Sequence, residues 1–281
     1  MKNNSNSDAG RTLSWVHELA QKHKKIYSQG GQDGIIEHII SNIDIENNFC
    51  VEFGYDHDTL TGGTGPNCAN LVINKKWDNL FLGGTFENKE INLHKHFLTT
   101  DNILDIFKAH NVPVNLGYLS IDVDSTELWL TDKVLEVYKP SFFSVEFNPN
   151  VPLQYAITIP NDPEFRWDDG SKVFGCSLKC LDIISKKYNY SLVYAGQWNT
   201  EAFTHDAFFV RNDLIKPGLE IPLLEDFAHA IVGIHDADTV NKYKICLDYE
   251  HYLKYNDLEE AQNIVRDISK KLFCEGTINK K

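Results

Sequence analysis

The sequence predicts an α/β fold in which a mainly parallel β-sheet carries helices on both faces. Short apolar runs of strand length alternate with amphipathic stretches of about 10 to 15 residues, which is the pattern of successive β-α-β units. Right-handed crossover connections then place successive helices on the two faces of the sheet. The 281 residues are enough for one large domain of this kind with a generous core.

The expected strands are short apolar runs, at residues 49–54, 80–82, 98–100, 116–121, 142–147, 192–194 and 207–210. The expected helices have apolar residues at helical spacing, at residues 12–26, 33–43, 67–75, 87–97, 101–109, 125–138, 173–188 and 257–272. Asp101 is placed to cap the helix that follows it, and Pro140 ends the helix before it. The irregular segment 149–170, rich in proline and aromatic residues, has the length of a lid or binding loop.

Three regions follow from this pattern. Residues 1–10 are polar, lack the apolar stretch of a signal peptide, and are expected to be a disordered lead-in. Residues 11–213 hold the α/β domain, and residues 214–281 form a charged helical extension. The extension leaves two roles open, capping the binding site or forming a homo-oligomer.

The net charge and the cysteine spacing argue against several classes of function. The net charge of −13 argues against a broad grip on nucleic acid or on an anionic membrane. No run approaches the roughly 20 apolar residues that span a bilayer. The six cysteines show no C-x-x-C spacing, so reduced core thiols and a cytoplasmic location are expected.

Polar residues and glycines follow the expected strands. Ligands of parallel sheets bind beyond the carboxyl ends of the strands, so these residues should converge on one edge. They are Glu52, Gly84, Thr100, Asp122, Asp124 and Glu146.

The first candidate site is Glu52 and Gly54, with the loop that leads to Asn67. A glycine directly after a strand lets the backbone come close to a ligand, and the next helix presents free N–H groups. The acid can accept hydrogen bonds from a ribose or an amine. A plain strand-to-turn glycine is the alternative.

The second candidate site combines Asp122, Asp124 and Glu146. Acids at adjacent strand ends bind hard cations such as Mg²⁺ or Mn²⁺, and one of them can act as a general base. A helix N-cap is the alternative role of Asp124. His205 is a further base near physiological pH, with a surface turn as the alternative.

Several short motifs occur together in one order: YSQGGQDG at 27–34, FCVEFG at 49–54, LSIDVD at 119–124, VEFNP at 145–149, GCSL at 175–178 and AFFVR at 207–211. In this the chain resembles the FkbM-type class I S-adenosylmethionine-dependent methyltransferases, over roughly residues 27–214. The resemblance implies a seven-stranded Rossmann-like sheet. It also implies methyl transfer, typically to a hydroxyl of a sugar or related natural product.

The resemblance also implies residue roles. Glu52 and Gly54 would line the methionine part of the cofactor, and Asp122 would lie beside the sulfonium and the acceptor. The remaining cofactor-binding residues would be Gln29, Asp33 and Asn67 at the methionine end and Asp101 near the adenine.

Three positions depart from the family pattern. The acid expected to bind the ribose after the second strand is replaced by Gly83 and Gly84, which leaves Glu87 as a substitute. Ser125 stands where a glycine usually follows the Asp-x-Asp segment. His205 and Asp206 replace a small polar residue. These departures bear on cofactor affinity and activity.

The sequence therefore predicts an S-adenosylmethionine-dependent methyltransferase that acts on a hydroxyl of a small-molecule or glycan acceptor. Asp122 or His205 would be the base, and Asp122, Asp124 and Glu146 would hold Mg²⁺ or Mn²⁺ if a metal takes part. Tyr155, Trp167 and Trp198 are candidate sugar platforms, with packing as the alternative. Two other functions stay open: a metal-dependent glycosyltransferase that uses the Asp-x-Asp segment, and a degenerate binding module without catalysis.

Overall fold

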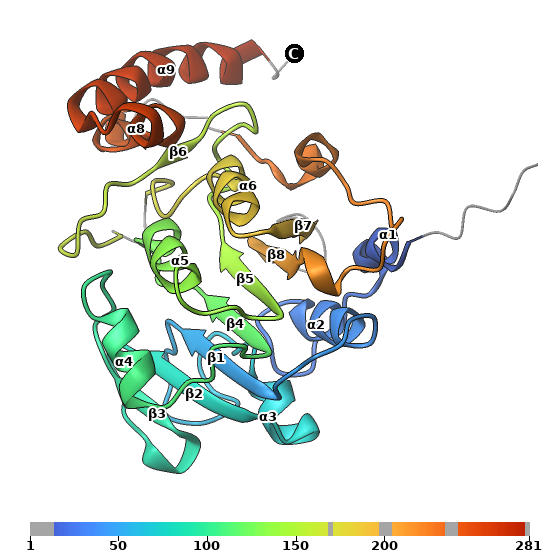
Figure 1. Cartoon of the computed structure of the whole chain (residues 1–281). Helices are drawn as coiled ribbons and strands as arrows, with labels where there is room; N and C mark the ends of the chain where they lie inside the picture. Colours follow the sequence, from blue (N-terminus) through green and yellow to red (C-terminus); the bar gives the residue numbers. More distant parts are fainter. Residues whose placement is uncertain (1–13, 168–170, 197–203, 234–240, 279–281) are drawn as a thin grey trace, which may run out of the picture.

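The computed structural model describes residues 14–167, 171–196, 204–233 and 241–278. Its centre is a seven-stranded sheet (Figure 1), whose strands lie in the order β3 (Leu93–Lys95), β2 (Asp78–Gly83), β1 (Phe49–Phe53), β4 (Tyr118–Ile121), β5 (Phe142–Glu146), β8 (Asp206–Arg211) and β7 (Tyr190–Ala195). Strand β8 runs antiparallel to both of its neighbours, while the pairs among β1 to β5 are parallel. The mainly parallel Rossmann-like sheet expected from the sequence is confirmed.

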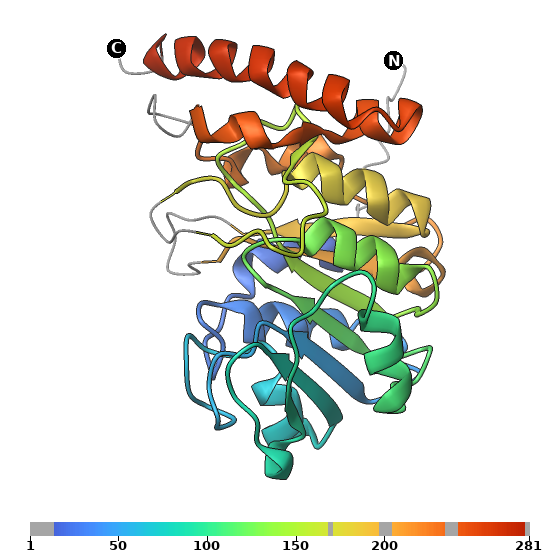
Figure 2. The ribbon, with the colours of Figure 1, turned by 90° about the vertical axis from the view of Figure 1, so that its left-hand side faces the viewer.

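Helices cover both faces of this sheet (Figure 2). One face carries α1 (Trp15–Glu18), α2 (Gln32–Ile40) and α3 (Ala69–Lys75), and the other carries α4 (Ile103–Ala109), α5 (Glu127–Leu135) and α6 (Leu178–Lys187). Because side chains alternate along a strand, β1 serves both cores: Val51 and Phe53 pack on the α4–α6 side and Cys50 on the α1–α3 side.

The C-terminal part of the chain adds a layer beyond the sheet. It contains β9 (Leu247–Asp248), α8 (Tyr249–Tyr255) and α9 (Leu258–Ile278), and β9 pairs with β6 (Ile157–Thr158). A third apolar cluster joins Val265 of α9 to residues of segment 149–175, among them Ile157 and Val173. The C-terminal helices predicted from the sequence are therefore present. They pack on residues of segment 149–170, which was expected to be a lid or binding loop, and on Val173.

The expected elements between β2 and α4 were wrong. Residues 87–97 form no α-helix; they form the 3-10 turn η2 (Lys89–Ile91) and strand β3. Residues 98–100, expected as the third strand, lie outside β3. Asn92 adopts a left-handed conformation (φ 55°), and Asn88 and Leu93 exchange two backbone hydrogen bonds, so the chain turns back tightly before β3.

Several helix ends also differ from the prediction. The N-terminal helix is short and continues as the 3-10 turn η1 (Leu19–Gln21). Asn102 rather than Asp101 occupies the N-cap position of α4, and α5 begins at Glu127 after Thr126, so Asp124 does not cap it. Helix α6 begins at Leu178, where the Ser177 hydroxyl accepts from the Cys180 N–H.

The remaining expectations for the whole chain concern membranes and cysteines. Within the described ranges, none of the helices combines the length and the apolar character that a bilayer-spanning segment needs. Buried free thiols are found at Cys50, Cys68, Cys176, Cys180 and Cys246. The predicted lead-in, residues 1–10, lies outside the described residues.

Candidate functional site

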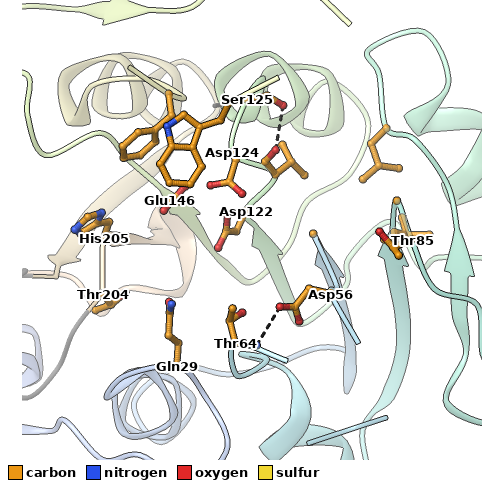
Figure 3. Close-up of a pocket in the computed structure, with 18 of the residues that line it drawn as sticks. Gln29, Asp56, Thr64, Thr85, Asp122, Asp124, Ser125, Glu146, Thr204 and His205 are labelled. Atoms are coloured by element: carbon orange, nitrogen blue, oxygen red, sulfur yellow. Dashed lines mark hydrogen bonds between the residues drawn. The ribbon is translucent and has the colours of Figure 1, made fainter. Parts of the chain in front are cut away.

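A cavity of about 1270 Å³ opens at the edge of the sheet where the parallel strands end (Figure 3). The loops after β1, β2, β4 and β5 all contribute to its wall. Strand order reverses between β1 and β4, because the chain goes from β1 outward to β3 and then returns to β4. Open α/β sheets bind their ligands at such a switch point, so this cavity is the candidate site.

Gly54 brings the loops after β1 and β4 into direct contact. Its φ is +76°, and a Cβ at this position would lie 1.7 Å from the backbone oxygen of Asp122. Only glycine fits both the conformation and the space. Gly54 and Asp122 therefore meet at one edge of the sheet, as the sequence predicted.

Glu52 holds the start of α3 next to this contact. The backbone N–H groups of Asn67 and Cys68 donate to its two carboxylate oxygens, at 2.7 and 2.9 Å. Burial raises the pKa of Glu52 to about 7, against the effect of these two hydrogen bonds. Glu52 and Asn67 line a smaller cavity of about 40 Å³ beside the large one.

Asp33 organises the turn before α2. One of its carboxylate oxygens accepts from the backbone N–H groups of Ile26, Tyr27 and Ser28, at 2.7 to 2.8 Å. Asp33 is fully buried and lies outside the lining of the cavity. The turn it fixes leads directly to Gln29, which does line the cavity.

Asp206, at the start of β8, contacts this region although it lies far from it in the sequence. Its Oδ2 accepts from Gln32 Nε2 at 2.9 Å and from the Thr204 hydroxyl at 2.6 Å. Because β8 is antiparallel, its first residues lie at the same edge as the last residues of β5. The sequence singled out neither Gln32 nor Thr204, although Gln32 belongs to the motif at 27–34.

Three carboxylates converge in the upper part of the cavity in Figure 3: Asp122, Asp124 and Glu146, with ligand oxygens that lie within 4.8 Å of one another. Burial and the neighbouring acids, with Asp124 foremost for Asp122 and Asp122 for Glu146, raise the pKa of Asp122 and of Glu146 well above their usual values. Glu146 Oε2 is buried and has no hydrogen-bond partner among the described residues. The structure thus brings together the three acids named from the sequence, and their oxygens are of the kind that hard cations prefer.

Glu127 shapes the loop that carries two of these acids, a role the sequence did not suggest. Its Oε1 accepts from the backbone N–H groups of Val123 and Ser125, at 3.0 and 2.8 Å. Between them Asp124 adopts a left-handed conformation (φ 55°), which aspartate tolerates better than most residues. Burial raises the pKa of Glu127 to about 7.

His205 lines the cavity on the side of Glu146, next to Thr204 (Figure 3). Its ring stacks at a centroid distance of 6.4 Å on Phe174, another lining residue. Burial lowers the pKa of His205 to about 4, so its imidazole is neutral at physiological pH. The neutral imidazole can accept a hydrogen bond, but its lowered pKa makes it a weaker base near physiological pH than the sequence suggested.

Other predicted residues lie elsewhere. Glu87 and Asp101 are exposed and do not line either cavity, and their cofactor roles stay predictions. Trp167 lines the cavity, whereas Tyr155 packs on the third apolar cluster, in line with the packing alternative. Trp198 lies outside the described residues. Asp56 lines both cavities, although the sequence did not select it.

Comparisons with known proteins add little to this geometry. Neither the scan against protein-family models nor the search of curated proteins gave a match. Among solved structures, one described as "Putative hemolysin from Streptococcus thermophilus" matches with a TM-score of 0.37 and 12% identity over 78% of each chain. The C-methyltransferase domain of a citrinin polyketide synthase matches with a TM-score of 0.33 and 11% identity, over 66% of this chain and 52% of that one.

Proposed function

We propose that this protein is an S-adenosylmethionine-dependent methyltransferase of the FkbM type that methylates a hydroxyl of a sugar or other small acceptor. The observation that carries the proposal is the acidic cavity at the switch point of the sheet, built around the Gly54–Asp122 contact. The motif order in the sequence supports the same family.

The lining of the cavity fits this cofactor. S-adenosylmethionine carries a positive sulfonium and a positive ammonium group at neutral pH. Among the described residues, four carboxylates line the cavity: Asp56, Asp122, Asp124 and Glu146. Gly54 and Gly84 let a ligand come close to the backbone, and the volume of about 1270 Å³ leaves room for an acceptor beside the cofactor.

The chemistry asks for an aligned acceptor and a group that takes its proton. The bound cofactor supplies the electrophilic methyl group, so positioning the acceptor oxygen in line does most of the work. Asp122 and His205 both line the cavity and are the candidate bases. Trp167 and Phe174 supply apolar faces that suit a sugar ring.

A divalent cation fits the same cavity. Asp122, Asp124 and Glu146 offer the hard oxygen ligands that Mg²⁺ and Mn²⁺ prefer, and they would hold the ion beside the acceptor hydroxyl. Such an ion would make that hydroxyl more acidic.

The cofactor proposal is tested by titrating S-adenosylhomocysteine, the product form of the cofactor, in a calorimeter. The wild-type protein is expected to bind, and Gly84→Arg is expected to lose binding. Gly84 lines the cavity, and a Cβ there meets nothing within 4 Å, so the arginine fills the cavity without strain in the fold. Gly54 is unsuitable for this purpose, because any side chain would collide with the Asp122 backbone.

Val114→Arg is the matched control, because Val114 is 50% exposed and lies outside the cavity lining. This variant should bind like the wild type, and both variants should keep the wild-type melting temperature. A folded wild-type protein that binds no adenosyl ligand would instead favour the degenerate binding module. Equal binding by Gly84→Arg and wild type would place the cofactor elsewhere.

The metal is tested by titrating Mn²⁺ at pH 6 and pH 8. Because the acids hold protons that the ion displaces, affinity should rise with pH and protons should be released. Glu146→Gln should weaken binding at least tenfold, with exposed Glu90→Gln as the control. Absence of Mn²⁺ binding at both pH values would remove the metal from the proposal. Stabilisation by Mn²⁺ with a nucleoside diphosphate, but not by S-adenosylhomocysteine, would favour the glycosyltransferase.

A further inference from the structure

The position after β2 cannot supply the acid that a nucleoside-binding sheet usually places there. In dinucleotide-binding folds an acid beyond the second strand accepts hydrogen bonds from the ribose. Here a Cβ at Gly83 would lie 2.1 Å from the backbone oxygen of Tyr55, so the close approach of the loop after β1 excludes a side chain. Gly84 faces open space, and exposed Glu87 lies outside the lining of the cavity.

The loop after β1 carries a carboxylate on this side of the cavity. Asp56 follows the end of β1 and lies beside Thr64 in Figure 3, and Thr85, after β2, lines the same cavity. Among the described residues, the other lining carboxylates are Asp122 and Asp124, in the loop after β4, and Glu146, the last residue of β5.

The loop at residues 61–65 contacts the carboxylate of Asp56 at two positions, Gly63 and Thr64. The backbone N–H of Thr64 donates to its Oδ2 at 3.0 Å. Gly63 has a φ of +67°, and a Cβ there would lie 1.8 Å from Asp56 Oδ1. The glycine therefore makes room for the carboxylate. A carboxylate accepts about four hydrogen bonds, so the one from Thr64 leaves capacity for a ligand.

We propose that Asp56 replaces the absent acid and accepts hydrogen bonds from the ribose hydroxyls of the adenosyl group. The proposal rests on the function proposed above and adds the residue that selects a ribose-bearing ligand. Removing the carboxylate should then lower the binding affinity only for a ligand that has the ribose hydroxyls. Removing the hydroxyls from the ligand should lower the affinity only for a protein that has the carboxylate.

The test is a cycle of two proteins and two ligands. Wild type and Asp56→Ala are each titrated with S-adenosylhomocysteine and with its 2′,3′-dideoxy analogue. The wild type should bind the analogue about tenfold or more weakly, as expected for hydrogen bonds to a charged group. Asp56→Ala should bind both ligands with nearly equal affinity, close to that of the wild type for the analogue. Asp58→Ala, in the same loop but outside the cavity lining, should behave like the wild type.

A rescue variant separates ribose recognition from damage to the loop. Adding Gly84→Asp to Asp56→Ala places a carboxylate in the open space after β2. The double variant should bind S-adenosylhomocysteine with most of the wild-type affinity. Its affinity for the dideoxy analogue should remain that of Asp56→Ala.

The outcomes distinguish this inference from the proposed function. If the wild type binds no S-adenosylhomocysteine, the proposed function fails and this inference fails with it. If the wild type binds S-adenosylhomocysteine but Asp56→Ala lowers the affinity for both ligands by the same factor, or changes the affinity for neither, Asp56 does not contact the ribose. Only this inference is then overturned. Loss of ribose selectivity in Glu87→Gln alone would assign the role to Glu87 instead.

Discussion

At the scale of single residues, the acids whose pKa is raised by burial fall into two groups. Glu52 and Glu127 accept hydrogen bonds from backbone N–H groups and fix loops, whereas Asp122 and Glu146 face the cavity. Both groups have raised pKa values, mainly because burial disfavours the charged form. The same electrostatic signature therefore marks positioning residues and candidate chemical groups, and only their geometry tells them apart.

Glu52 should make the stability of the protein depend on pH. Its pKa is about 7 in the folded state against 4.5 ordinarily, so between these values the folded protein holds a proton that the unfolded chain has lost. The free energy of unfolding therefore falls as pH rises through this window, by up to about 1.4 kcal/mol per pH unit from this group. Glu52→Gln removes the titration, so urea unfolding between pH 5 and pH 7 should show a shallower decline than in the wild type.

Glu90→Gln is the control for this measurement, because Glu90 is exposed and its loss should leave the slope unchanged. Parallel pH profiles for the wild type and Glu52→Gln would show that Glu52 is ionised throughout the range.

The sequence identified the cavity acids better than the residues that support them. Asp122, Asp124 and Glu146 each follow or end an apolar strand, and strand ends can be predicted from the pattern. Glu127 and Asp206 act through hydrogen bonds to backbone or to distant side chains, and no local pattern marks such partners. Asp56 was missed because its place in the cavity depends on its contacts with Gly63 and Thr64, which only the folded loop shows.

At the scale of elements, the wrong predictions fall where the elements are short. Strand β3 has three residues and lies at the edge of the sheet, so the period-two signal is too short to detect. The left-handed Asn92 that precedes it also interrupts what reads as a helical pattern. The apolar strands β1, β4 and β5 were predicted within a few residues, because burial on both faces imposes continuous apolar runs.

Helix α9 braces the segment that forms one wall of the cavity. Val265 is fully buried in the third apolar cluster with residues of segment 149–175, and that segment carries Trp167, Lys172 and Phe174 of the lining. Val265→Ala is expected to lower the free energy of unfolding by about 2 kcal/mol. Backbone hydrogen exchange in segment 149–175 should increase.

Lys270→Ala tests whether this effect is specific to the apolar contact. Lys270 lies on the same helix with a side chain that is 72% exposed, so its replacement should change stability by no more than about 0.5 kcal/mol. Equal exchange in the two variants would mean that α9 does not support the wall.

At the scale of the whole molecule, alternation of strands and helices was sufficient to predict the sheet and the edge that carries the cavity. That prediction works because crossover handedness and the position of switch points follow from backbone geometry and not from particular side chains. The pattern could not predict that β8 runs antiparallel to its neighbours, because an apolar run in the sequence does not indicate in which direction the strand enters the sheet. Ligand identity depends on the shape of the cavity and the balance of charge within it.

The hydrogen bond between Gln32 and Asp206 has a consequence for how the protein is made. It joins residues separated by 174 positions in the chain, so the nascent polypeptide must reach β8 before this part of the pocket can close. Contacts of such long range are slow to form, because a large loop loses its freedom before any contact compensates for it. Chains released from the ribosome before Asp206 would carry β1 to β5 but would lack strand β8 and this hydrogen bond.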